Sequence, residues 1–172
     1  MKVLQRLGVV VIAIAMAGCT QPTSPSSKVS LAHTFDSPEA LAQAVLTGLA
    51  SKDVAGLNAL ALSEQEFKDH VWPELDTSRP ERNVPFEYAW GQLKQRSDGY
   101  LDVTVGRYAG QKLRFVSTRY TGETTKYPSF SVMRDSEIVA ADDTGRDLVL
   151  RLFGSAMGKD GRYKLFSFVV DD

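Results

Sequence analysis

The stretch PFEYAWGQLKQRSDGYLDVTVGRYAGQKLRFVSTRYT, residues 85–121, contains the point at which the chain changes from helical to strand periodicity. Its first part carries one stripe of side chains at helical spacing, made of Phe86, Trp90, Leu93, Ser97, Leu101, Thr104 and Tyr108. This spacing predicts one long helix that starts at Pro85 and stops at Gly110. Residues 112–121 then follow a strand pattern, so we expect helices before this point and strands after it.

The chain before this stretch also has helix signals. Residues 37–39 (Ser-Pro-Glu) combine an N-cap serine, a proline at the first helical position and an acid in the first turn, which predicts a helix to about Ser51. Asp53 can cap a second short helix. Residues 63–66 form a capping-box pattern that opens a third, which we expect to end by Trp72-Pro73. A polar loop is expected over residues 76–84.

The chain after this stretch is composed of short strand patterns separated by turn residues. These patterns cover residues 112–121, 129–134, 137–141, 147–153 and 162–170. Short connections join antiparallel neighbours. Helices followed by a strand meander predict an α+β fold, with N-terminal helices packed on a curved, mainly antiparallel sheet. Residues 33–172 are enough for a single domain of this kind.

The N-terminal residues have the layout of an export signal. Lys2 and Arg6 flank the start of an uncharged run over residues 7–17, which is shorter than the roughly 20 residues needed to span a bilayer. The run ends in the tetrapeptide Met16-Ala17-Gly18-Cys19, which contains the only cysteine of the chain. Residues 21–30 are rich in proline, serine and threonine, which predicts a flexible tether.

This tetrapeptide resembles the lipobox of bacterial lipoproteins, with methionine where leucine is commoner. The resemblance implies a lipoprotein signal peptide over residues 1–18 and a lipidated N-terminus and tether over residues 19–32. Cys19 would receive a diacylglycerol, with fatty acyl chains such as palmitate, and would anchor the protein to a membrane of the bacterial cell envelope. Because Thr20 rather than aspartate follows Cys19, the resemblance implies the outer membrane, facing the periplasm, if the organism has two membranes. The alternative is an ordinary buried cysteine after an apolar helix.

The order of helices and strands resembles the NTF2-like superfamily, the cone-shaped fold of nuclear transport factor 2 and ketosteroid isomerase. That superfamily usually places short strands before its last long helix, and residues 76–84 supply no clear strand. A cystatin-like helix-on-sheet fold is therefore the alternative. The segments FKDHVWPEL (67–75) and RLFGSAMGKDGRYKLFSFVVD (151–171) also resemble a family of exported bacterial proteins, a resemblance that implies no particular activity.

Composition excludes several classes of function. Removing Lys2 and Arg6 from the 20 basic residues leaves 18 against 21 acidic ones, and this mild acidity argues against nucleic acid as a partner. One cysteine and two histidines are too few for a structural zinc site, and no calcium loop, GxGxxG motif or P-loop is present. We therefore expect no metal and no cofactor. Residues 154–158 (GSAMG) are not a G-x-S-x-G nucleophile elbow, and we interpret them as a strand end.

One pair of residues is a weak candidate for catalysis. Glu66 and His70 are i, i+4 neighbours on the third predicted helix. A carboxylate beside an imidazole can form a proton-transfer pair. The alternative, which we favour, is a surface contact between the two side chains on a capped helix.

Five residues are candidates for ligand binding: Trp72, Tyr88, Trp90, Arg119 and Arg134. The three aromatic residues are expected in the core or on the rim of a pocket. Arg119 shares strand parity with Phe115, and Arg134 shares it with Phe130 and Val132. If those phenylalanines point into the cone, both guanidinium groups point inward as well. A carboxylate partner would then come from the protein or from an anionic ligand. The alternative is an internal ion pair or exposure at a strand end.

We therefore expect a non-catalytic, lipid-anchored envelope protein whose domain binds a small ligand or an envelope protein partner. One alternative is an isomerase- or hydrolase-like enzyme that uses a cone pocket, with Glu66, Asp69 or His70 as the base. Its hydrogen-bond donors would be among the tyrosines Tyr88, Tyr100 and Tyr120. A third possibility is a purely structural envelope subunit.

Overall fold

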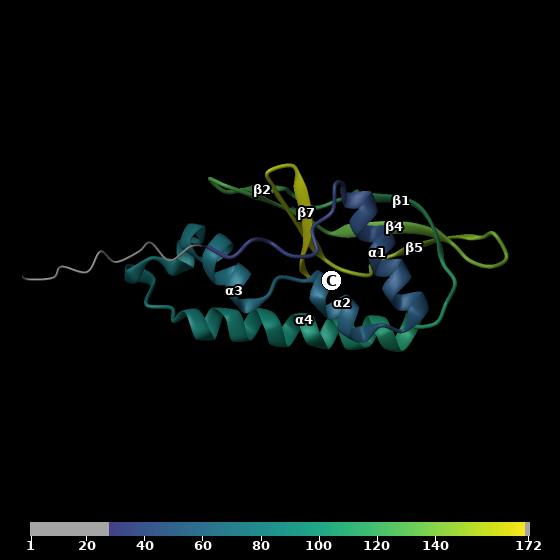
Figure 1. Cartoon of the computed structure of the whole chain (residues 1–172), viewed down its shortest axis with the longest axis horizontal. Coiled ribbons are helices and arrows are strands. Elements are labelled where there is room, and N and C mark those ends of the chain that lie inside the picture. The colour runs from purple at the N-terminus through teal and green to yellow at the C-terminus, as the bar shows by residue number, and fades with distance from the viewer. Residues whose placement is uncertain (1–27, 171–172) are drawn as a thin grey trace, which may run out of the picture.

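Four α-helices precede seven β-strands in the computed structural model of this chain, which describes residues 28–170. Helices fill the first half of this range and antiparallel strands fill the second, which confirms the α+β class (Figure 1). The expected signal peptide, the lipobox with Cys19 and the tether up to residue 27 lie outside the described residues.

The first two helices begin where their caps predict. Helix α1 (Pro38–Ser51) is capped by Ser37, whose hydroxyl accepts the Ala40 N–H at 3.1 Å. Helix α2 (Val54–Leu60) is capped by Asp53, whose carboxylate accepts the Gly56 N–H at 2.8 Å. Both helix predictions are confirmed.

The third helix begins as expected and then changes its winding. The capping box of α3 (Glu64–Glu66) is present, with Ser63 and Glu66 bonding each other's backbone N–H. A π-helical turn η1 (Phe67–Val71) continues it, followed by three 3₁₀ turns, η2 (Trp72–Glu74), η3 (Asp76–Ser78) and η4 (Pro80–Arg82). Proline is tolerated in the first turn of a helix, so Pro73 starts a tighter turn instead of ending helical structure.

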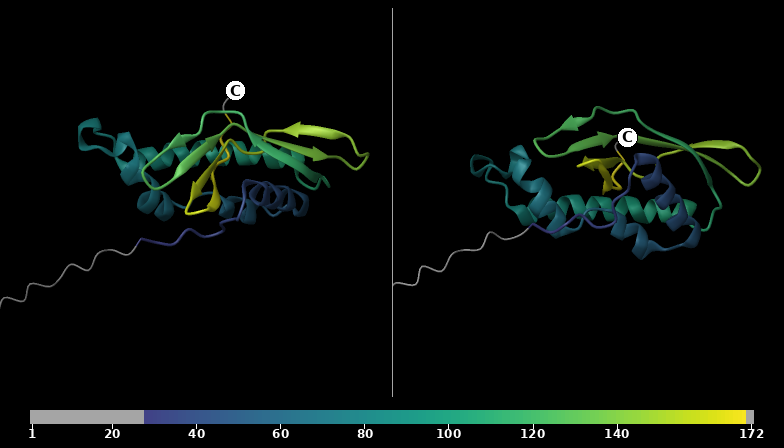
Figure 2. Two further views of the ribbon diagram at one scale, coloured as in Figure 1. Left: turned by 90° about the horizontal axis from the view of Figure 1, so that it is seen from above. Right: turned by 45° about the horizontal axis from the view of Figure 1, so that its top comes forward.

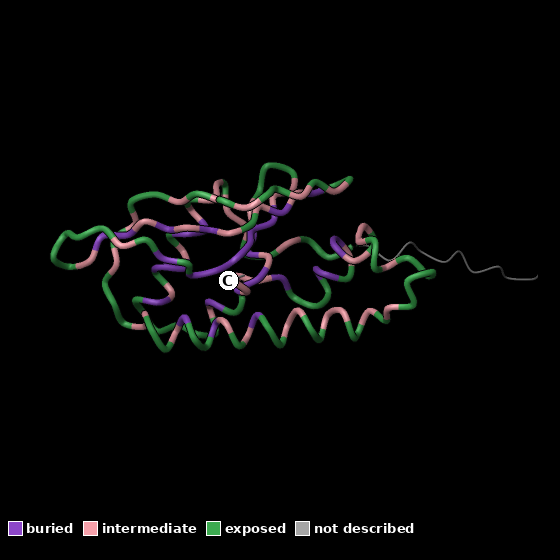
Figure 3. The backbone as a smooth tube through the Cα atoms, turned by 180° about the vertical axis from the view of Figure 1, so that it is seen from behind, coloured by how far each residue is buried: buried purple, intermediate pink, exposed green. Residues whose placement is uncertain are grey.

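The long helix α4 (Phe86–Tyr108) matches its prediction closely. It buries Ser97, Leu101 and Thr104, which lie at the centre of the predicted stripe. Figure 3 shows how buried and partly buried residues recur between exposed ones along the helix.

The strands form two antiparallel sheets, ordered β1-β4-β5 and β2-β3-β6-β7. Their bounds are β1 (Arg114–Tyr120), β2 (Thr125–Lys126), β3 (Ser131–Arg134), β4 (Ser136–Ala141), β5 (Asp147–Leu150), β6 (Ser155–Lys159) and β7 (Arg162–Ser167). The five predicted strand patterns are found; four have shorter bounds, and β4 begins one residue earlier than predicted. Two strands were not predicted, β2 and β6, and residues 155–158 of the segment expected as a strand end belong to β6.

The two sheets are successive parts of one bent meander. Strand β4 pairs with β1 on one side and with β5 on the other. Strand β3 pairs with β2 on one side and with β6 on the other. We call the boundary between the two sheets, at Asp135 and Gly154, the crease. Two backbone hydrogen bonds cross it: the Thr121 N–H donates to Asp135 O at 3.0 Å, and the Ser136 N–H donates to Gly154 O at 3.2 Å. The turn expected at Asp135-Ser136 is thus a bend between sheets, where Asp135 has a φ of 56°.

Helices cover one side of this bent sheet (Figure 2). The main core cluster joins α1 and α2 to the β1-β4-β5 sheet and includes Leu41, Leu49, Ile138 and Phe153. A second cluster lies under the other sheet, where Phe67 and Val71 of η1 meet Val132 and Met157. The candidate site lies between these clusters, where η1 and α3 approach β7.

Candidate functional site

A segment that we call the strap, residues 29–36, runs lengthwise from the first described residues past α3 to α1 (Figure 1). At its start, the Val29 N–H donates to Asp69 Oδ2 at 2.9 Å, and His70 Nε2 lies 2.5 Å from the Val29 carbonyl oxygen. The π-helical turn η1 presents Asp69 and His70 side by side, so that one residue binds each polar group of Val29.

The middle of the strap is held by a buried ion pair. The Ala32 N–H donates to Glu66 Oε1 at 2.7 Å, and Lys164 Nζ donates to the Ala32 carbonyl oxygen at 2.6 Å. Lys164 Nζ lies 3.4 Å from the same Glu66 oxygen. Glu66 comes from the capping box of α3 and Lys164 from β7, so the strap joins a helix to a strand.

The end of the strap pairs with the edge of β7. Phe35 and Tyr163 exchange both backbone hydrogen bonds at 2.8 Å, as in an antiparallel ladder. Arg162 donates to the Thr34 carbonyl oxygen at 2.8 Å and forms an ion pair with Asp36. Residues 29–32, expected as the end of a flexible tether, are therefore bound to the domain.

The Glu66–Lys164 pair is almost completely buried, with 4% and 1% of the two residues exposed. Burial alone would raise the pKa of Glu66, but hydrogen bonds from the Ser63 and Ala32 N–H groups and the charge of Lys164 outweigh it, and the pKa is lowered. Burial lowers the pKa of Lys164, and the attraction of Glu66 opposes that change. The carboxylate of Glu66 is thus stabilised as an acceptor and is a weak base.

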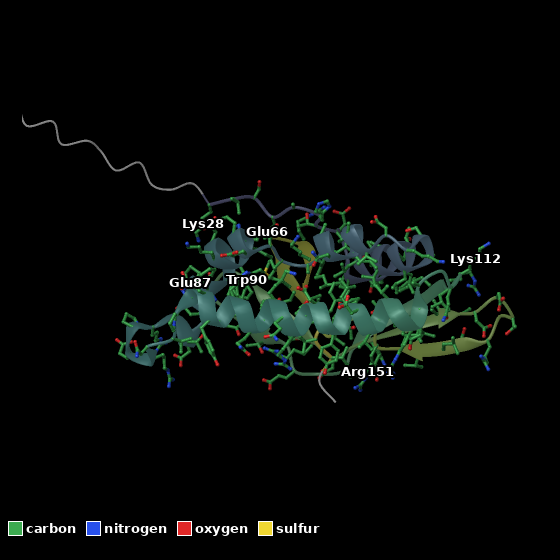
Figure 4. All side chains as sticks on the ribbon, turned by 90° about the horizontal axis from the view of Figure 1, so that it is seen from below. Lys28, Glu66, Glu87, Trp90, Lys112 and Arg151 are labelled. Atoms are coloured by element: carbon green, nitrogen blue, oxygen red, sulfur yellow. The ribbon has the colours of Figure 1, made fainter. Side chains whose placement is uncertain are left out.

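A cavity of about 490 Å³ adjoins this ion pair. It lies between the strap, the connection from α2 to α3, helix α4 and strand β7. Its lining combines apolar side chains, including Ala59, Leu62 and Trp90, with charged ones, including Lys94 and the Glu66–Lys164 pair. Figure 4 shows Glu66 and Trp90 near one another, the first from α3 and the second from α4.

Two contacts fix the α4 side of the cavity. Trp90 packs against Phe67 with ring centroids 5.4 Å apart, so its indole is held by the second core cluster. Lys94 forms an ion pair with Asp98 one turn later at 2.5 Å, and 39% of its side chain is exposed. Lys94 is the more exposed charged group of this site, whereas Glu66 and Lys164 are buried.

The interpretation of Glu66 and His70 as a surface contact is wrong, because both residues are buried. Each has its own partners: Glu66 binds Ser63, Ala32 and Lys164, while His70 Nε2 binds the Val29 carbonyl. His70 Nδ1 is buried without a hydrogen-bond partner among the described residues. His70 does not line the cavity.

The aromatic candidates separate from one another. Trp90 lines the cavity. Trp72 packs edge-on against Phe86, with centroids 5.7 Å apart, outside the cavity lining. Tyr88 lies on the outer side of α4 and is 63% exposed.

The inward orientation expected for Arg119 is wrong. A register shift between Phe115 and Ser117 breaks the alternation of β1, so Phe115 and Arg119 no longer share a face. The side chain of Arg119 is 69% exposed and pairs with Glu137 on β4 at 2.5 Å. This is the protein carboxylate that we gave as one alternative.

Arg134 is also exposed, at the end of β3 beside the crease. Its Nε donates to Thr125 Oγ1 at 3.3 Å on the neighbouring strand. It therefore corresponds to the alternative of exposure at a strand end, and it lies away from the cavity.

Sequence reasoning missed Lys94 and Lys164. Lys164 alternates with Phe166 and Phe168, and this parity with apolar residues is the signal that marks it as inward-facing. Lys94 carries no such signal, because a lysine one turn from an aspartate on a long helix is ordinary.

Comparisons with protein-family models, curated proteins and solved structures find no match for this chain. Among residues 28–170, no helix has the length and apolar content needed to cross a membrane. The same residues contain no cluster of three or more histidine, cysteine or acidic side chains arranged to hold a metal ion.

Proposed function

We propose that this chain is a lipid-anchored protein of the bacterial cell envelope, and that its NTF2-like domain binds a small ligand without changing it chemically. The lipobox-like tetrapeptide supports the anchor. A long last helix followed by a bent antiparallel meander, with helices on one side, supports an NTF2-like fold. The 3₁₀ turns in place of strands before α4 depart from that fold, and a cystatin-like arrangement is the alternative.

The engagement of Glu66 favours binding over catalysis. A general base needs an oxygen that faces the proton it removes and a pKa near the working pH. Both oxygens of Glu66 accept hydrogen bonds, from the Ala32 N–H at 2.7 Å and the Ser63 N–H at 2.8 Å, and the pKa of Glu66 is lowered. A carboxylate in this state holds structure together and is a poor proton acceptor.

The donors that an isomerase-like enzyme would use lie elsewhere. Tyr88, Tyr100 and Tyr120 are absent from the described cavity lining. Tyr88 is exposed, and burial raises the pKa of Tyr120. The described lining therefore lacks the tyrosine donor that an isomerase of the resembled fold would place opposite the carboxylate, and this favours binding over that chemistry.

The cavity indicates what kind of ligand fits. A volume of about 490 Å³ lies within the range of ordinary small-molecule sites, about 300–1,000 Å³. Trp90 and Leu62 offer apolar contact, and Lys94, which pairs with Asp98 and is partly exposed, offers a charged donor. We therefore propose a ligand with an apolar or ring-containing body and one acceptor group that faces Lys94.

Native mass spectrometry of the protein purified from its own host tests this proposal. The wild type should carry a small-molecule adduct. Ala59→Trp places a large side chain in the cavity lining and should lose the adduct, whereas Ala55→Trp, on the exposed part of α2, should keep it. A wild type without an adduct, or an adduct that survives Ala59→Trp, would contradict the proposal.

A further inference from the structure

The strap is bound through its backbone, at every third residue. Val29, Ala32 and Phe35 each use both their N–H and their C=O in hydrogen bonds. Val29 bonds to Asp69 and His70, Ala32 bonds to Glu66 and Lys164, and Phe35 bonds to Tyr163. The partners come from two walls, formed by α3 and η1 on one side and by β7 on the other. This regular spacing indicates a groove that binds an extended chain through its backbone.

Two side chains of the strap enter the protein. Leu31 packs against the second core cluster and Phe35 against the main one, and both are half-buried. Val29, Ser30, Ala32 and His33 are exposed. Backbone bonds combined with pockets for a few side chains are the way in which proteins bind extended peptides at a sheet edge.

The end of the strap next to α1 carries a charge that the groove complements. Asp36 pairs with Arg162 of β7. An acid at this end therefore meets an opposite charge on the strand that forms one wall.

We infer that this groove is a peptide-binding site which the strap occupies in cis, and that an extended segment of a partner protein replaces the strap. The segment has apolar residues at the positions of Leu31 and Phe35 and an acid at that of Asp36. This inference goes beyond the proposed small-ligand function, and it does not depend on it. Ala32 and His33 also line the cavity, so the exchange changes one side of that site.

The buried ion pair explains why the groove exchanges occupants and does not stay empty. Without the strap, Glu66 and Lys164 would each lose a backbone partner in a buried setting, which is costly. A second extended chain restores both bonds, because they go to backbone groups that every residue has. The apolar contacts that an incoming chain has to match are those of Leu31 and Phe35.

Fluorescence anisotropy with a labelled peptide of residues 28–36, KVSLAHTFD, tests the inference on the full chain. Ala32→Pro removes the N–H that binds Glu66 and so weakens the strap in cis. This variant should bind the peptide at least tenfold more tightly than the wild type. Ser30→Ala, at an exposed position of the strap, should behave as the wild type.

A peptide with alanine in place of its leucine and phenylalanine should bind the Ala32→Pro variant at least tenfold more weakly. Equal binding of the two peptides, or no gain in a folded Ala32→Pro variant, would overturn the inference. If Ala32→Pro does not fold, hydrogen exchange on the wild type decides. The Ala32 amide should exchange at least tenfold faster than that of Met157 in β6, and equal protection would show that the strap leaves only when the domain unfolds.

Discussion

Lys164 is a charged residue in a strand whose neighbouring positions are apolar, and its buried ammonium group is stabilised by Glu66. Both residues are nearly inaccessible, and the two groups lie 3.4 Å apart. Removing one member of a buried pair leaves the other charge without compensation, which typically costs about 3–5 kcal/mol. The pair is therefore a larger determinant of stability than any exposed ion pair of this domain.

Lys164→Met should lower the free energy of unfolding by about 3–5 kcal/mol, measured by urea denaturation. The matched control is Lys126→Met on exposed strand β2, which should change it by no more than about 0.5 kcal/mol. A Lys164→Met variant as stable as the control would mean that Glu66 is satisfied by its backbone donors alone.

Glu66 also gives the domain a defined response to acid. The pKa of Glu66 in the folded state lies below the usual value of a glutamate, about 4.3, so its stabilisation is fully present above that pH and is lost as the pH falls through the lower, folded value. The free energy of unfolding should therefore decrease from about pH 5 to pH 3, and Glu66→Gln should flatten this decrease. The exposed neighbour Glu64→Gln is the control, and an unchanged slope in Glu66→Gln would contradict the assignment.

Sequence reasoning identified Glu66 of this pair but not Lys164. Glu66 was recognised as a capping-box residue and as a possible base, and the capping role is confirmed. Its burial was not predictable from helix periodicity, because the residue that buries it, Lys164, lies about a hundred positions later and the strap covers both. Arg119 was misplaced for a related reason, since a single bulge reverses parity and leaves no mark in the sequence.

At the scale of elements, the crease of the meander is the place where an added side chain is least tolerated. Gly154 lies where the chain passes from β5 to β6, and a Cβ there would overlap the carbonyl oxygen of Val169. Its N–H donates to Ser167 O at 3.3 Å, which ties the crease to the end of β7. Glycine is needed here for close approach of two backbones.

Gly154→Ala should destabilise the domain by about 1–3 kcal/mol, the usual cost of overpacking. Gly99→Ala on the exposed side of α4, where a Cβ meets nothing within 4 Å, should instead stabilise it by about 0.5–1 kcal/mol. Thermal unfolding of the two variants measures both. Similar midpoints for Gly154→Ala and the wild type would show that the crease can open at little cost.

The elements were largely predictable, and the bending of the sheet was not. Caps at Ser37, Asp53 and Ser63 carry local hydrogen bonds, so helix starts could be recognised from a few residues each. The crease consists of turn-forming residues such as Asp135 and Gly154, which indicate an interruption of the strand. They do not indicate whether the chain reverses or only bends, because that depends on the neighbouring strands.

At the scale of the whole molecule, the proposed anchor and the strap are parts of one N-terminal segment. Cys19→Ala should abolish metabolic incorporation of a radiolabelled fatty acid and leave an uncleaved or soluble exported form, detected by fractionation of the host cells. The reason is that the sulfur of Cys19 is the proposed site of attachment, and the chain has no other cysteine. Continued labelling of the variant, with correct processing, would refute the lipoprotein interpretation.

The strap is the part of the site that the residue composition did not predict. A run of polar and small residues before His33 suggests a tether, yet residues 29–32 are held by side chains of α3, η1 and β7. These four hydrogen bonds go to the backbone of Val29 and Ala32, and backbone groups are the same in every residue, so the sequence of the strap does not reveal them. A sequence can therefore predict the helix and strand that form the groove, but not the segment that occupies it.

The central claim is that the cavity beside Glu66 holds a ligand and leaves it chemically unchanged. Liquid chromatography with mass spectrometry can identify the compounds released from wild type and from Glu66→Gln, both purified from the host and confirmed as folded. Because Glu66 is committed to Ser63, Ala32 and Lys164, the two proteins should release the same compound. Release of one compound from the wild type and of a different compound, related to it by a chemical step, from Glu66→Gln would show that the cavity is an active site.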